Sequence, residues 1–495
     1  MPSSFERRID AKLILSILAC GLMSFSGVVV ETAMNVTFPS LMTEFGVSTA
    51  LVQWVTTGYL LVLTAIMPLS SLLKRRFRTK TLFLVAIVLF IVGTITCALA
   101  SAFPTLIAGR VVQGLGTGLA LPLMFNIVIE QAPLDRMGMM MGVATLITAS
   151  APAVGPSVGG LIVTLWGWRT IFWALLPLLA ISLVAGLYAI RQVSETQQVK
   201  FSPAQFAALA GGFVCLVFAT SSASTAGWLS AQVLGLFAAA VVLLAAFVAL
   251  SSKSENPLIR VAIFRNRRFV LCLAYMVLFQ AIVLGLGYLI PYYGQVVCGQ
   301  NAFDAGCLLL PGCIIGAILA PVGGRFLDIL GARKPLTIGA GIQLLSMVLF
   351  IAVAFGNEPW VFMAVYFIVP IAQGLSMSNS MTTGLTFLPE SLKTDGNATF
   401  TTLQQLGGAL GTAVCTSIVN ASQTANAADL VAGTLAGTEL SLYVLLGVSV
   451  VAAICIICVF VGGRRRASKA NPKPKRQLSR RFLSAAATHL RGLST

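Results

Sequence analysis

The sequence predicts an all-α membrane protein with fourteen spans and both ends of the chain in the cytoplasm. The first reason is composition. Of the 495 residues, 57% are hydrophobic and 9% are charged, whereas soluble globular chains carry roughly 25% charged residues. The second reason is that long apolar runs recur along the chain, and the third is that lysine and arginine gather in alternate connections between these runs.

Each apolar run is long enough to cross a bilayer, because a membrane-spanning helix needs about 20 apolar residues. The first run reads as a retained span rather than a cleaved signal peptide, because it is long and follows a polar segment. An even number of spans places both ends on one side. The fourteen runs are residues 13–38, 49–73, 81–102, 104–129, 138–163, 168–190, 204–222, 231–250, 269–294, 304–324, 335–355, 359–382, 397–420 and 440–462.

The basic residues set the orientation, because cytoplasmic loops of membrane proteins carry an excess of lysine and arginine. With both ends in the cytoplasm, 30 of the 32 basic residues fall on that side. The exceptions are Arg169, at the outer edge of a span, and Arg110, inside the fourth span. This sorting accounts for the net charge of +17 without any nucleic-acid partner.

Two short basic connections, SSLLKRRFRTK and GGRFLDILGARK, indicate an internal repeat, because each follows the second helix of a six-helix group. Repeats of this kind place the substrate site between their halves, near the membrane midplane. We expect the two inserted spans to contribute little to that site. The expected organisation is a six-helix bundle in 1–190, a linker with two inserted spans in 191–268, a second six-helix bundle in 269–463 and a basic cytoplasmic tail in 464–495.

No pattern indicates catalysis, a cofactor or a metal, so we expect none of them. The ten cysteines are scattered through apolar segments, and the single histidine is His489 in the tail. A G-x-x-x-x-G-K-[ST] sequence is absent, which argues against a pump that carries its own ATPase. Cys298 and Cys307 flank a short outer loop, where a disulfide is possible but the required geometry is narrow.

The C-terminal tail turns amphipathic from Arg480 onwards. One interpretation is a disordered tail that follows the charge rule. The other is an interfacial helix that lies on anionic lipid.

Glu31 lies inside the first apolar run, in the stretch VVVETAMNVTF. A carboxylate at the centre of a membrane helix costs on the order of 2.5–3.5 kcal/mol, and such residues are usually functional. Small or polar residues precede and follow it at helical spacing, which predicts one face turned towards protein or water rather than lipid. That face carries Cys20, Ser24, Gly27, Glu31 and Asn35.

Glu31 and Arg110 are predicted to lie at similar depth. Glu31 precedes Pro39 by eight residues, and Arg110 follows Pro104 by six. At about 1.5 Å per residue, both lie roughly 9–12 Å below the outer helix ends. We expect Glu31 to carry the transported proton and Arg110 to set its proton affinity. The alternatives are a satisfied structural carboxyl and a structural ion pair or backbone clamp.

Several motifs together resemble the fourteen-helix drug:proton antiporter family of the major facilitator superfamily, over residues 12–462. They are ETAMNVTFP at 31–39, VQWVTTGYLL at 52–61, LIAGRVVQGLGTG at 106–118, APAVGPSVGG at 151–160, WGWRTIFW at 166–173 and TLQQLGGALGTA at 402–413. Glu31 stands where the family has aspartate. The resemblance implies the major facilitator fold, with two six-helix bundles and two inserted helices.

The resemblance also implies gating residues. In helix 5 these are Gly142, Gly155, Pro156, Gly159 and Gly160, which either form a hinge or provide static close packing. In the second basic connection they are Gly324, Asp328, Gly331 and Arg333. The first connection departs from the family, because Ser71, Arg75 and Arg78 replace its Gly, Asp and Gly. In the family the loop aspartate is thought to tie the halves together, which Arg75 cannot do with the same sign of charge.

Polar or aromatic residues within the spans are candidates to line a substrate cavity, although each alone fits helix packing better than contact with a ligand. An aromatic cavity with few charges would suit amphipathic or cationic organic molecules. Besides Asn35, these candidates are Trp54, Tyr59, Asn126, Gln280, Tyr288, Gln373, Asn379 and Gln404.

The sequence therefore predicts a proton-coupled antiporter that exports hydrophobic or amphipathic compounds, such as drugs, from the bacterial cytoplasmic membrane. Its expected partners are a small-molecule substrate, protons and the lipid bilayer, and we expect it to act as a monomer. One alternative is export of an endogenous lipid, peptide or siderophore. A channel or a non-transporting receptor is the other.

Overall fold

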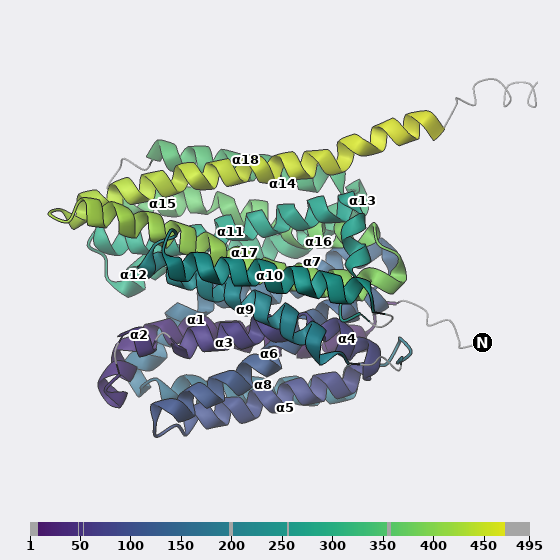
Figure 1. Cartoon of the computed structure of the whole chain (residues 1–495), viewed down its shortest axis with the longest axis horizontal. Helices are drawn as coiled ribbons and strands as arrows, with labels where there is room; N and C mark the ends of the chain where they lie inside the picture. The colour runs from purple at the N-terminus through teal and green to yellow at the C-terminus, as the bar shows by residue number, and fades with distance from the viewer. Residues whose placement is uncertain are drawn as a thin grey trace, which may run out of the picture.

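The structure is a computed structural model that describes residues 8–470, except 48, 53, 198–200, 255–256 and 354–357. Within these residues the chain forms helices and no strand. We call α1–α8 the N-terminal half and α11–α18 the C-terminal half, and Figure 1 shows them one above the other. The helices of the N-terminal half are α1 (Ala11–Phe45), α2 (Thr49–Val52), α3 (Trp54–Ile66), α4 (Leu69–Arg76), α5 (Thr79–Ala98), α6 (Phe103–Gln131), α7 (Met137–Trp166) and α8 (Arg169–Ala189).

The inserted helices are α9 (Pro203–Ala226) and α10 (Ala231–Ser252), which pack against each other. Helix α9 also contacts α3 and α17, so it lies where the two halves meet. The helices of the C-terminal half are α11 (Arg267–Val296), α12 (Ala302–Cys307), α13 (Leu310–Leu330), α14 (Arg333–Val353), α15 (Pro359–Tyr366), α16 (Ile368–Thr386), α17 (Glu390–Ala425) and α18 (Leu430–Ala470). Two short 3₁₀ helices, Leu134–Arg136 and Val261–Arg265, precede α7 and α11.

Each of the fourteen predicted runs coincides with helical structure, but not every run is one straight helix. By length and hydropathy, eleven described helices can cross a membrane, or thirteen if two bent pairs are counted as single spans. The bend between α3 and α4 is 50° and lies at Met67 and Pro68, where proline lacks the backbone N–H that would continue the helix. Helix α17, which contains predicted run 397–420, is not among these helices.

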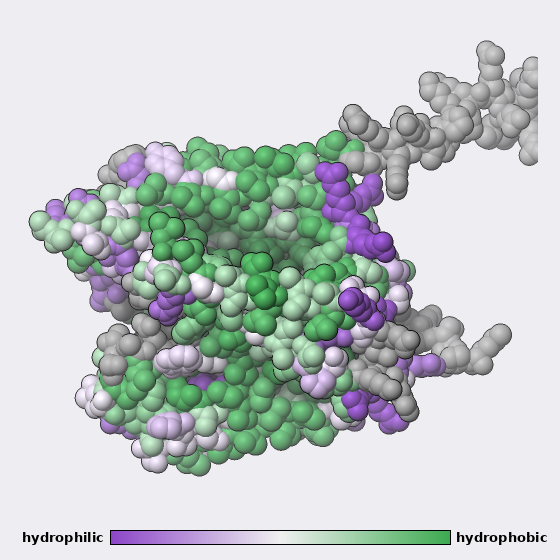
Figure 2. Space-filling model, viewed as in Figure 1, coloured by the Kyte–Doolittle hydropathy of each residue, from purple (hydrophilic) through white to green (hydrophobic). Residues whose placement is uncertain are grey.

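Polar contacts join the connections that the charge rule places on one side. Arg191 pairs with Asp10, and the buried Lys74 contacts both Ser194 (2.8 Å) and Glu130 (3.1 Å). At the opposite end, Arg169 pairs with Glu44 at 2.6 Å. In Figure 1 the start of α1 and the end of α18 lie at the same end of the molecule. Figure 2 shows hydrophobic residues across the middle of this face and hydrophilic residues gathered at its two ends.

Single-cysteine labelling will test the sidedness of the two ends. In a variant without the ten native cysteines, we expect Thr196→Cys to react with a membrane-impermeant maleimide only from the cytoplasm. We expect Asp429→Cys to react only from outside. The side chains of Thr196 and Asp429 are both exposed, and their connections are predicted to lie on opposite sides of the membrane. Labelling of Thr196→Cys from outside would contradict the predicted orientation.

Cys298 and Cys307, at the predicted outer loop, are not joined by a disulfide in this structure. Gly299, between them, adopts a positive φ of 66°. The loop is held by a hydrogen bond from the Gln300 backbone N–H to Gly294 O at 2.9 Å. Its local structure therefore does not depend on a disulfide.

Candidate transport site

Arg110 is completely buried, at 0% exposure, on α6 between α1, α3 and α5. Its Nε donates to the backbone carbonyl of Val55 at 2.9 Å, and its Nη1 donates to Oε1 of Gln113 at 2.9 Å. Gln113 in turn donates to the Thr94 hydroxyl at 2.9 Å. The guanidinium is thereby fixed in orientation by three helices.

Tyr59 completes the surroundings of this guanidinium. Its ring lies 4.2 Å from the Arg110 guanidinium carbon, in a cation–π contact. Its hydroxyl donates to the backbone carbonyl of Gly27 on α1 at 3.1 Å. A Cβ at Gly27 would lie 2.5 Å from Thr117 Cγ2, so only glycine lets α1 come this close to α6.

Glu31 lies one helical turn after Gly27, on the face of α1 that contacts this cluster. One of its carboxylate oxygens is buried without a hydrogen-bond partner, and so is Nη2 of Arg110. The two groups are close enough for their charges to interact. Among the described residues no ion pair within 4.0 Å joins them. A buried carboxylate oxygen and a guanidinium nitrogen are therefore both available for a proton, water or a ligand.

Helix α7 packs against both halves through its glycines. Near its end, Gly155 faces Thr32 of α1, and a Cβ at Gly159 would lie 2.6 Å from Ala33 Cβ. Near its start, Gly142 lies against the backbone of Ala320 in α13. These contacts leave no room for larger side chains and make α7 the helix that joins the surroundings of Glu31 to the C-terminal half. Gly160 is half-buried, and the side chain of Pro156 lies outside the described part of the chain.

Asp328 of α13 fixes the start of α7. Its two carboxylate oxygens accept the backbone N–H groups of Gly138 (2.8 Å) and Met139 (3.0 Å), so the acid caps a helix N-terminus. Gly324 lies against the carbonyl of Gly138. Gly331 ends α13 with a positive φ of 73°, which glycine adopts without strain, and the exposed Arg333 begins α14.

The cavity-lining candidates do not gather at one place. Gln404 donates to Gln280 at 3.3 Å, which brings α17 and α11 together. The fully buried Asn379 donates to the backbone carbonyls of Gly323 and Leu375, each at 2.9 Å, so it holds α16 against α13. Asn126 accepts a hydrogen bond from Asn397 at 2.8 Å, across the two halves.

The remaining candidates are more scattered. Trp54 packs on Phe218 of the inserted helix α9 with ring centroids 5.9 Å apart, and Tyr288 stacks on Tyr292 at 5.3 Å. Gln373 is half-buried, and the side chain of Asn35 lies outside the described part of the chain.

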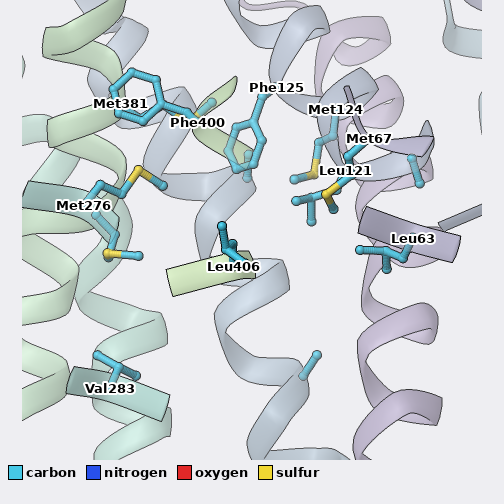
Figure 3. Packing of buried hydrophobic residues seen from close by; sticks show 14 of the residues in the cluster. Leu63, Met67, Leu121, Met124, Phe125, Met276, Val283, Met381, Phe400 and Leu406 are labelled. Atoms are coloured by element: carbon cyan, nitrogen blue, oxygen red, sulfur yellow. The ribbon is translucent and has the colours of Figure 1, made fainter. Parts of the chain in front are cut away.

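The residues that meet at the centre are apolar, so they are not among the polar and aromatic candidates that the sequence suggests. Figure 3 shows side chains of the N-terminal half facing those of the C-terminal half, with Phe400 and Leu406 of α17 between them. Methionines occur on both sides, and their flexible side chains adapt to irregular shapes. We call this set the central seam: Leu63, Met67, Leu121, Met124, Phe125, Met276, Val283, Met381, Phe400 and Leu406.

The fold and these contacts define a helical membrane transporter rather than an enzyme, and comparison with known proteins identifies its family. The family model described as Major Facilitator Superfamily matches residues 20–412. The chain therefore belongs to the major facilitator superfamily, and it is a multi-pass protein of the cell membrane. The human organic anion transporter MFSD10 (TETRAN) has the same fold, with a TM-score of 0.61 over 90% of this chain and 99% of that chain at 12% identity.

Bacterial relatives are more similar in sequence. A lincomycin resistance protein, LmrB, of Listeria monocytogenes is 36% identical over 83% of this chain and 88% of its own length. A multidrug resistance protein B homolog of Mycobacterium tuberculosis is 29% identical over 83% of this chain and 77% of its own length. These relatives agree with the multidrug efflux family that the sequence motifs indicate.

Proposed function

We propose that this protein exports hydrophobic or amphipathic organic compounds, including drugs, in exchange for protons. The observation that carries the proposal is Glu31, an acidic side chain in α1 with a buried, unpartnered oxygen close to the Arg110 guanidinium. Two relatives are named for resistance to lincomycin and to multiple drugs. These names favour drug export over release of an endogenous product.

The central seam is the proposed substrate surface. It is apolar on both sides and bears methionines, which suits a transporter that accepts compounds of different shapes. In this structure the seam residues pack in one buried cluster, so substrate binding requires the halves to separate. The polar candidates Gln280 and Gln404 lie on the same two helices as Met276 and Leu406, and we propose that they contact the polar part of a substrate.

The proposed transport cycle uses fourteen spans with both termini in the cytoplasm. Protons entering from outside bind Glu31 and weaken its hold on a cationic substrate, which leaves to the outside. When the cavity opens to the cytoplasm, Glu31 releases its proton and the next substrate binds. Arg110, held by Val55 and Gln113, sets the balance between the two forms of Glu31. A single protein chain contains every group in this cycle.

Transport into inverted membrane vesicles will test the proposal. With a pH gradient, acid inside, we expect accumulation of lincomycin and of a fluorescent lipophilic cation, tested separately. A protonophore should abolish it, because collapse of the gradient removes the driving force. Accumulation that survives the protonophore would overturn proton coupling. If neither compound accumulates, drug export is overturned.

A further inference from the structure

The two repeated basic connections hold opposite charges at matching positions. In the second connection Asp328 accepts backbone N–H groups at the start of α7. In the first connection Arg75 occupies the corresponding position and donates instead. Its Nη2 lies 2.7 Å from the carbonyl oxygen of Pro257 and 3.0 Å from that of Leu258. Ser71 also donates to the Leu258 carbonyl, at 2.9 Å.

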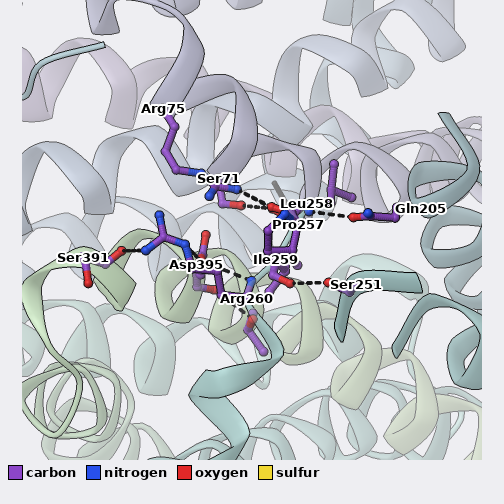
Figure 4. A network of polar contacts seen from close by, with 11 residues as sticks. Ser71, Arg75, Gln205, Ser251, Pro257, Leu258, Ile259, Arg260, Ser391 and Asp395 are labelled. Atoms are coloured by element: carbon purple, nitrogen blue, oxygen red, sulfur yellow. Dashed lines mark hydrogen bonds and ion pairs between the residues drawn. The ribbon is translucent and has the colours of Figure 1, made fainter. Parts of the chain in front are cut away.

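These carbonyl groups belong to a short segment between α10 and α11, residues 257–260, which we call the strap (Figure 4). The inserted helices hold the strap in place. Gln205 of α9 accepts the backbone N–H of Leu258 at 2.9 Å, and Ser251 of α10 donates to the carbonyl of Ile259 at 2.8 Å. The strap is therefore fixed to the inserted pair and to the N-terminal half together.

The other end of the strap binds the C-terminal half. Arg260 lies 3.6 Å from the carboxylate of Asp395 on α17, and its backbone N–H donates to the same oxygen at 3.3 Å. The Arg260 guanidinium also donates to the carbonyl of Ser391 at 3.0 Å. Helices α4 and α17 also contact each other directly, and the four residues of the strap add a second connection between them.

Asp395 makes this connection sensitive to the loss of its partners. Its side chain is 1% exposed, and its second oxygen has no hydrogen-bond partner. A buried charge that loses its partner is strongly destabilising. The two cations that face it come from different elements, Arg75 from α4 and Arg260 from the strap. Movement of the strap out of this position would take Arg260 away from Asp395, so the ion pair favours the closed arrangement.

We propose that the strap, with Arg75, Arg260 and Asp395, is a latch that closes this end of the seam between the two halves. In this latch Arg75 helps to connect the two halves, as Asp328 does at the matching position of the second connection, but with the opposite charge. It also assigns a role to the inserted helices, which carry Gln205 and Ser251: they hold part of the gate. The inference rests on the proposed function only in that opening of this end is a step of transport.

Accessibility of a buried cysteine will test the latch without substrate or proton gradient. Asn397 donates to the carbonyl of Pro122 in α6 at 2.8 Å, so this face of α17 lies against the N-terminal half. Thr401, one turn further along the same face, is 0% exposed. In the variant without native cysteines, Thr401→Cys is labelled by a maleimide added to inverted vesicles, and the rate reports opening of this end.

Loss of the latch should speed this labelling. We expect Arg260→Gln and Asp395→Asn each to raise the rate about tenfold, within the range of coupling between two states. The double variant should be no faster than the faster single variant, because both remove one connection. Asp328→Asn, at the other clamp, serves as the positive control. Arg265→Gln is the matched control: it removes the same charge from an exposed residue close to the strap and should leave the rate unchanged.

Three results would overturn the latch. They are labelling of Arg260→Gln at the rate of Arg265→Gln, rates that multiply in the double variant, and equal acceleration in right-side-out vesicles. Size-exclusion elution and helix content are measured for every variant. If Asp395→Asn does not fold, Ser71→Ala, which removes a single hydrogen bond to the strap, takes its place with an expected increase of about threefold. Proton-coupled transport can fail in the vesicle assay while these rates still support the latch.

Discussion

Glu31→Gln is expected to abolish proton-coupled efflux while the protein still folds and inserts. The amide has nearly the shape of the acid but cannot release or accept a proton at neutral pH. Because one oxygen of Glu31 is buried without a partner, the substitution breaks no hydrogen bond to that atom. Loss of efflux would then show that efflux requires a group at this position that binds and releases a proton. Glu31→Asp should retain much of the activity, since it keeps the carboxyl group and the family has aspartate at this position.

Substrate-induced proton release from liposomes is the decisive measurement. The matched control is Glu44→Gln on the same helix, whose carboxylate pairs with Arg169 at the opposite end from the strap. It should release protons as the wild type does. Wild-type proton release from Glu31→Gln would show that the carrier lies elsewhere. Asp395, which is 1% exposed, would then be the next acid to replace.

Arg110→Lys is expected to lower efflux by about tenfold or more. A compact ammonium does not reproduce the guanidinium fork, which here donates to Val55 and Gln113 while it lies over the Tyr59 ring. Hydrogen bonds to charged groups contribute roughly 1.5–3 kcal/mol each, so loss of one is enough for this effect. The charge remains, and the orientation towards Glu31 is lost.

Efflux and the pH dependence of proton release will be measured together for this variant. We expect the pH at half-maximal release to move as well as the rate, because Arg110 interacts with the charge of Glu31. Arg169→Lys is the control, since it makes the same substitution at a half-exposed arginine in the same half. An unchanged pH dependence with reduced efflux would indicate that Arg110 only supports the packing of α6.

The sequence alone predicts where the helices lie. All fourteen predicted runs coincide with helical structure, because a chain in a bilayer must satisfy its backbone hydrogen bonds within each segment. It also singles out Glu31 and Arg110, because a charge inside an apolar run stands out without any knowledge of its neighbours. Gln113, three residues after Arg110, had a weaker signal: it lies on the same helical face.

Only the tertiary structure shows which residues meet. Arg75 appears in the sequence as a departure from a family pattern, and its partners, Pro257 and Leu258, are backbone carbonyls more than 180 residues away. Asp395 falls just outside run 397–420 and has no visible signal of burial. The central seam is equally hidden, because methionine, leucine and phenylalanine are the ordinary residues of every span.

The sequence by itself determined the class of this protein, where its helical runs lie and the position of an acid within the first apolar run, because hydropathy and charge act locally along the chain. The tertiary structure decided that Glu31 lies near Arg110 without an ion pair, that α7 joins the two halves, and that the strap lies between α4 and α17. These features depend on contacts between distant segments. Their energies come from close packing and from hydrogen bonds, which no pattern of residue types along one helix records.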